Sequence, residues 1–99
     1  MWATDYIKRL KCGETIKIRP HGNSMQGRIE SGQLVTIEPV GSKILFKGDI
    51  VLCKVNGKQY LHLISAISTD SRYQISNNKN HVNGWTTINN IFGVVTNVE

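Results

Sequence analysis

A serine between small or slender neighbours is the first feature of this sequence that could carry chemistry. The segment Gly22-Asn23-Ser24-Met25 follows an extended run of residues. A nucleophilic serine needs little side-chain bulk around its hydroxyl and free backbone N–H groups that can receive a developing oxyanion. Gly22 lets the chain turn sharply, because glycine has no Cβ. We therefore take Ser24 as a candidate nucleophile, and Asn23 and Met25 as candidate oxyanion or cleft residues.

A histidine in a later apolar run is the candidate general base. His62 lies in the run Tyr-Leu-His-Leu-Ile at positions 60–64. Neutral imidazole, with a reference pKa of about 6.5, accepts a serine proton near neutral pH, whereas a lysine would first have to be desolvated and neutralised. The alternative interpretation of His62 is a half-buried strand histidine that hydrogen-bonds a neighbour. The alternative interpretation of Ser24 is a turn serine that caps the segment 24–29.

The two other histidines do not form a metal-binding motif with His62. His21 is close enough in sequence to Ser24 to line the same cleft, and His81 falls in the polar segment 77–84, where we expect it to be solvated. Together with His62 they lack ligand spacings such as HxH or HExxH. We therefore expect neither a metal site nor a cofactor.

One short helix is predicted before the strands, over residues 4–11. Thr4 is a residue type that caps helices, Ile7 and Leu10 share a face, and Gly13 can end the helix. Further along, the hydrophobic period changes to two, which is typical of half-buried strands. We expect strands near 15–20, 33–38, 49–55, 58–67 and 89–97.

Asn56 and Gly57 give the clearest local signal. An Asn-Gly pair between two apolar runs is typical of a two-residue type I′ hairpin, because both central residues need a positive φ. This turn makes Val51 face His62 and puts Asp49 on the same side, as a diagonal neighbour about 7–8 Å from His62. Asp49 is therefore the candidate for orienting the imidazole.

The composition is that of an ordinary globular domain. With 99 residues, 39% of them hydrophobic and 19% charged, the chain forms a single domain, residues 1–99, with a helical segment at 1–13. No apolar run approaches the ~20 residues that span a bilayer, and no signal-peptide pattern follows Met1. We expect a cytoplasmic protein without a membrane partner. Cys12 and Cys53 form no CxxC pair, and Cys53 lies in an apolar run, which indicates a buried hydrophobe.

The net charge of +5, from 12 basic and 7 acidic residues, could attract nucleic acid as a binding partner. The basic residues are spread along the chain without interleaved aromatics. We expect at most weak, sequence-independent binding to nucleic acid. The sequence indicates no oligomeric state.

Five short blocks resemble, in the same order, the LexA/UmuD and signal-peptidase superfamily of serine peptidases. The blocks are Gly22–Met25, Gly32–Val35, Gly48–Val51, Tyr60–Ile64 and Ile91–Val95. The family pattern runs roughly G-x-S-M, G-D-x-V, a strand that carries the general base, and a closing I-x-G-x-V strand. The resemblance covers about positions 14 to 97.

The resemblance implies a mainly β, LexA-like (β-clip type) catalytic-domain fold with one short N-terminal helix. It also implies a soluble serine endopeptidase in which Ser24 attacks a peptide bond of a peptide or protein substrate. In most of the family a lysine activates the serine. The endoplasmic-reticulum and archaeal signal peptidases use histidine instead, and His62 falls at that position.

The chain departs from the family pattern at three places. Gly27 replaces the usual proline, and Leu63 replaces the basic residue that commonly follows the base. The block that resembles the Gly-Asp-Asn motif of signal peptidases reads Ser-Asn-Asn at 76–78, so the carboxylate that supports a histidine base is missing unless Asp49 or Asp70 supplies it. A catalytically degenerate remnant that binds a peptide, a protein or nucleic acid is therefore the alternative function.

Overall fold

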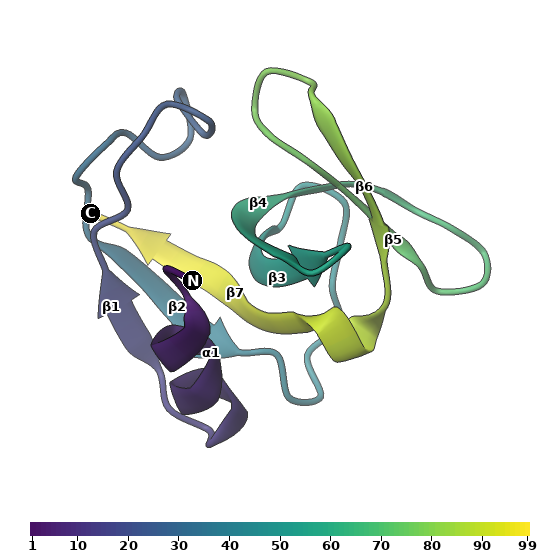
Figure 1. Ribbon diagram of the computed structural model, residues 1–99, viewed down its shortest axis with the longest axis horizontal. Coiled ribbons are helices and arrows are strands. Elements are labelled where there is room, and N and C mark those ends of the chain that lie inside the picture. The colour runs from purple at the N-terminus through teal and green to yellow at the C-terminus, as the bar shows by residue number, and fades with distance from the viewer.

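The computed structural model describes residues 1–99, and Figure 1 shows one curled antiparallel sheet with a single short α-helix. The elements are α1 (Thr4–Lys11), β1 (Ile16–Ile18), β2 (Val35–Pro39), β3 (Ile50–Val55), β4 (Lys58–Ile67), β5 (Tyr73–Ser76), β6 (Val82–Thr86), the 3-10 turn η1 (Ile88–Asn90) and β7 (Ile91–Val98). The seven strands lie in the order β1-β2-β7-β3-β4-β5-β6. No helix has the length and the apolar character needed to cross a bilayer. The predicted mainly β class with one N-terminal helix is confirmed.

Helix α1 has the predicted bounds but a different N-terminal cap. Thr4 is the first helical residue, and the N-cap is Ala3, which has no capping side chain. Instead, the side-chain Oε1 of Gln59 in β4 accepts the N–H of Ala3 at 2.8 Å. The buried Ile7 and Leu10 pack the helix against β1, β2 and β7. The helix is therefore fixed to the sheet both by its apolar face and by its first backbone donor.

The predicted hairpin joins β3 to β4. Asn56 and Gly57 have φ values of 51° and 80°, as a type I′ turn requires. The register places Val51 opposite His62 and Cys53 opposite Tyr60. The register predicted from the Asn-Gly pair is confirmed, and it places His62 on the same face as Val51.

Strand β3 is buried on both faces and separates two apolar clusters. Ile50 and Leu52 belong to the cluster that contains the buried side of α1, and Val51 and Val55 belong to the cluster on the other face. A continuous apolar run is expected of a strand that is covered on both sides. The neighbouring β4 follows the same alternation, and Leu61 packs into the cluster under the helix.

Both cysteines are free thiols. Cys12 is exposed, whereas Cys53 is fully buried in β3, as its apolar neighbours predict. Burial raises the pKa of the Cys53 thiol to about 12. The thiol is therefore protonated near neutral pH and packs as a small hydrophobe.

The hairpin of β5 and β6 was not predicted. Positions 77–84 were expected to be a polar loop, but β6 begins within them, because its pairing with β5 outweighs the low strand propensity of asparagine and glycine. A Cβ at Gly84 would lie 3.0 Å from Cγ1 of Val55, so glycine permits this edge strand to pass close to the tip of the β3–β4 hairpin. The Oγ1 of Thr86 donates to the carbonyl oxygen of Lys54 at 2.9 Å and ties β6 to β3.

Gly93 in β7 marks the closest packing between the helix and the sheet. A Cβ there would lie 2.6 Å from Cγ2 of Ile37 and 2.9 Å from Cδ1 of Leu10. We expect Gly93→Ala to destabilise the protein by about 1–3 kcal/mol, as overpacked cores do. Urea unfolding measures the change. Thr96→Ala, at an exposed position of the same strand, should stay within about 0.5 kcal/mol of the parent, and equal stability of the two variants would contradict the packing.

Candidate active site

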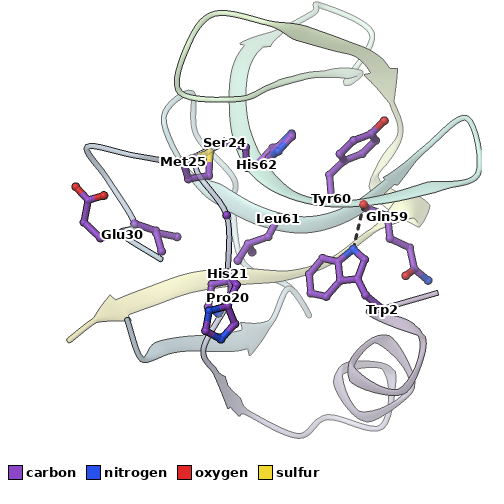
Figure 2. Close-up of a pocket in the computed structure, with 12 residues that line it drawn as sticks. Trp2, Pro20, His21, Ser24, Met25, Glu30, Gln59, Tyr60, Leu61 and His62 are labelled. Carbon is purple, nitrogen blue, oxygen red and sulfur yellow. Dashed lines mark hydrogen bonds between the residues drawn. The ribbon is translucent and has the colours of Figure 1, made fainter. Parts of the chain in front are cut away.

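A pocket of about 270 Å³ lies between the loop that carries Ser24 and the first half of β4. It is lined by Trp2, Pro20, His21, Gly22, Ser24, Met25, Ile29, Glu30, Gln59, Tyr60, Leu61 and His62. Figure 2 draws Ser24 and His62 on one side of this view of the pocket and Trp2 on the other. The candidate nucleophile and the candidate base, which are far apart in sequence, therefore border one cavity.

Ser24 lies in a series of tight turns that is anchored in the core. The carbonyl oxygen of Met25 accepts the N–H groups of Arg28 and Ile29 at 2.9 and 2.8 Å. The side chains of Met25 and Ile29 are buried in the cluster under the helix, whereas Ser24 itself is exposed. The N–H groups of Ser24 and Met25 make no hydrogen bond within the protein. Both donors are thus without a partner in the protein, as an oxyanion-binding role requires.

Asn78, in the loop between β5 and β6, holds this series of turns. Its backbone N–H donates to the carbonyl oxygen of Ser24 and its Nδ2 donates to that of Gln26, both at 2.8 Å. Gly27 has a φ of +96°, which proline cannot adopt, and a Cβ there would lie 3.1 Å from Nδ2 of Asn78. The two departures from the family pattern, Gly27 and the Ser-Asn-Asn block, are therefore in contact with each other and support the serine turn together.

His62 is held by its neighbours on β4 and β6. Its side chain is buried, and the ring of Tyr60 packs beside it with the two ring centroids 5.0 Å apart. Nδ1 of His62 lies 2.6 Å from Oδ1 of Asn83. A carbonyl oxygen is only an acceptor, so Nδ1 carries the proton and Nε2 is left as the acceptor. This tautomer is the one in which Nε2 can take a proton from a hydroxyl group.

The surroundings of His62 favour its neutral form. Burial lowers the pKa of His62 below its ordinary value of 6.5; the hydrogen bond to Asn83 opposes this shift, and the electrostatic interaction with His81 adds to it. A histidine with such a pKa is neutral at pH 7, which is the state that a general base requires.

Asp49 does not orient His62, so that prediction was wrong. Its Oδ2 accepts the N–H of Phe46 at 2.8 Å and closes the turn before β3. Asp70, the other acid considered, accepts a hydrogen bond from the hydroxyl of Ser68 in a turn after β4. Each carboxylate satisfies a donor close to it in sequence, and Asn83 takes the place beside the imidazole.

Only some of the remaining candidate residues line the pocket. His21 and Met25 line the pocket, whereas Asn23 is not among its lining residues. Ser31 Oγ accepts the N–H of Gly22 at 3.1 Å and lies 3.5 Å from Nδ1 of His21, so these residues close the base of the loop. The structure gathers no group of three His, Cys, Asp or Glu side chains that could hold a metal ion.

Sequence reasoning missed Asn83. Apolar and polar residues alternate only weakly around it, at Val82, Gly84 and Trp85. The asparagine-rich stretch before these residues resembles an ordinary loop. A hairpin assignment for 73–86 would have placed Asn83 on a strand. Nothing local connects it to His62, however, because the two residues belong to strands that do not pair with each other.

The family model described as Peptidase S24-like matches residues 5–96 of the chain. The chain belongs to this family. A search of curated proteins and a search of solved structures gave no match. The match covers nearly the whole chain and confirms the resemblance to the LexA/UmuD-like serine peptidases. The structure is accordingly that of a Peptidase S24-like, serine peptidase-like domain.

Burial of neutral His62 should make this domain less stable in mild acid. Its pKa in the folded state lies below 6.5, so the unfolded chain binds the proton more readily. The contribution of His62 to stability is therefore complete above about pH 6.5 and is lost as the pH falls through the folded pKa. Urea unfolding at a series of pH values should show this decline. His62→Gln should flatten it and His21→Gln should not; equal slopes in all three proteins would contradict the assignment.

Proposed function

We propose that the domain is a serine endopeptidase in which Ser24 is the nucleophile and His62 the general base. Asn83 then holds the imidazole in the productive tautomer. The observation that carries the proposal is the 2.6 Å contact between His62 Nδ1 and Asn83 Oδ1, which leaves Nε2 free on a base that borders the same pocket as Ser24. Membership of the Peptidase S24-like family supports a peptide bond as the target.

The reaction would follow the general course of serine peptidases. Nε2 of His62 takes the hydroxyl proton as Oγ of Ser24 attacks the peptide carbonyl carbon, and the free N–H groups near Ser24 stabilise the oxyanion. The imidazolium then gives its proton to the leaving amine, and an acyl-enzyme ester remains at Ser24. Water, deprotonated by His62, hydrolyses this ester and restores the serine. A neutral amide as the third member has a precedent in the Cys-His-Asn triads of papain-like peptidases.

A peptide-binding remnant is the second candidate. The observation that favours it is that no direct hydrogen bond joins the side chains of Ser24 and His62, although both border one pocket. Catalytic hydrogen bonds are often long in ligand-free enzymes and shorten only when substrate is bound. Covalent chemistry at Ser24 therefore distinguishes the two candidates.

A diphenyl phosphonate probe should form one covalent adduct with the protein, at Ser24. Ser24→Ala removes the attacking oxygen and His62→Ala removes its base, so each variant should lose the adduct in intact-mass measurements. Ser42→Ala, at an exposed position away from the pocket, is the matched control and should label like the parent. Labelling that persists in Ser24→Ala, or is absent from the parent, would favour the remnant.

Replacing Asn83 should slow labelling without removing it. Asn83→Ala leaves the buried Nδ1–H without its acceptor, and the loss of such a partner costs about 1–3 kcal/mol, which corresponds to a rate about five- to 150-fold lower. The rate of phosphonate labelling above pH 7 measures this effect. Asn97→Ala, at an exposed position of β7, is the control.

Asn83→Asp should change the pH dependence of labelling. A carboxylate beside the imidazole stabilises its charged form and so raises the pKa of His62. Because the base acts when neutral, the acid side of the rate profile should move to higher pH than in Asn83→Ala. The ring signals of His62, followed by NMR, should titrate with the same shift. Identical profiles in the Asp and Ala variants would exclude contact between position 83 and the base.

A further inference from the structure

Trp2 forms the side of the pocket that lies opposite Ser24. In Figure 2 the indole lies below Tyr60, beyond Leu61, on the side away from Ser24. The residue remains 50% exposed although it precedes a helix that is packed on the sheet. Single exposed aromatic residues are common on proteins, so exposure alone assigns no role to Trp2.

The indole is fixed in place by the start of β4. The buried Gln59 accepts a hydrogen bond from Nε1 of Trp2 at its main-chain oxygen, at 3.3 Å. The side chain of Gln59 accepts the N–H of Ala3 at 2.8 Å and donates to Oγ1 of Thr4 at 3.1 Å. The ring of Tyr6 meets the indole edge-on, with centroids 6.4 Å apart. Trp2 is therefore held from two sides while its remaining surface stays open.

The other exposed tryptophan lacks such support. Trp85 on β6 is 41% exposed, makes no side-chain hydrogen bond and does not line the pocket. A ring that is already fixed loses little conformational entropy when a ligand packs against it. Trp2 is thus exposed and fixed in place, which favours ligand binding, whereas no hydrogen bond fixes the ring of Trp85.

The part of the pocket next to Trp2 suits an uncharged side chain. Leu61 and Tyr60 continue the wall from Trp2 towards His62, and the one carboxylate of the lining, Glu30, lies on the far side in Figure 2. Indole, aliphatic and aromatic surfaces together favour the burial of apolar groups. Trp2, Tyr60 and Leu61, which line this end, carry no charged side chain.

We propose that Trp2 forms a subsite for a bulky apolar side chain, such as leucine or phenylalanine, of the peptide that reaches Ser24. The inference rests on the proposed function in taking the ligand to be a peptide. Trp2 is a specificity-determining residue in this scheme, because it contacts the substrate away from the scissile bond. The serine, the base and Asn83 act without it.

Binding of small amides to the catalytically silent Ser24→Ala protein tests the subsite without any need for hydrolysis. The probes are N-acetyl-leucinamide, N-acetyl-phenylalaninamide and N-acetyl-alaninamide, each titrated into ¹⁵N-labelled protein. We expect the leucine and phenylalanine probes to shift the amide signals of residues 59–62 and to bind roughly tenfold more tightly than the alanine probe, because they bury more apolar surface.

Substitutions in the same background locate the preference. Trp2→Ala should weaken the two bulky probes by roughly tenfold and leave the alanine probe unchanged. Trp2→Phe keeps an apolar ring without the indole donor and should retain most of the preference. Trp85→Ala is the matched control and should bind as the parent does. Thermal unfolding of each variant confirms that the compared proteins are folded.

Equal affinity for the three probes, or an unchanged preference in folded Trp2→Ala, would overturn the subsite. Its failure is separable from that of the proposed function. Trp2-dependent binding in a protein whose Ser24 takes no phosphonate would uphold the subsite and reject the peptidase. Labelling of Ser24 together with a Trp2→Ala protein that keeps its preference would uphold the peptidase and reject the subsite.

Discussion

The alternation of side chains along β4 fixes the positions of the four residues that this strand contributes to the pocket. Gln59 and Leu61 face the helix, where one caps its first turn and the other packs into the cluster beneath it. Tyr60 and His62 face the opposite side, towards the second half of the sheet. A shift of one residue in the register of β4 against β3 would exchange these faces, so Tyr60 and His62 would point towards the helix. The two-residue turn between β3 and β4 prevents such a shift, because it sets the register from the hairpin tip.

The hairpin of β5 and β6 connects the two halves of the site. Asn78, in its loop, binds the carbonyl oxygens of the serine turn, and Asn83, on its second strand, binds the imidazole of His62. The hairpin reaches both because Gly84 lets β6 pass close to Val55. Ser24 and His62 come from separate parts of the chain, so this hairpin relates their positions through hydrogen bonds to both.

An amide in place of a carboxylate beside His62 changes the balance of charge in the site. A carboxylate would stabilise the imidazolium and raise the histidine pKa, whereas the Asn83 hydrogen bond only partly opposes the effect of burial. His62 therefore stays neutral to a lower pH. In the proposed reaction the same arrangement would give less stabilisation to the imidazolium than a carboxylate would. The tautomer is preserved, because orientation requires only an acceptor at Nδ1.

Local sequence determined much of this structure. The Asn56-Gly57 pair specified a turn and with it the register of His62, and the spacing of Ile7 and Leu10 specified helix α1. The order of the short blocks indicated the family that the profile match confirms, and it selected Ser24 and His62 as the residues to examine. These features could be predicted because each depends on neighbours within a few positions, through backbone conformation or hydrophobic period.

The tertiary structure alone decided which groups serve the site. Asp49 was chosen from strand geometry, but a nearby N–H satisfies its carboxylate. Asn83 and Gln59 gave no local signal, because the partners of both lie far away in sequence. A polar side chain acquires its role from whichever donor or acceptor the folded chain brings within about 3 Å, and that distance depends on the path of the whole sheet. The sequence could therefore nominate Ser24 and His62 as candidates, whereas the fold selected Asn83 as the partner of the imidazole and Gln59 as the partner of Trp2 across the pocket.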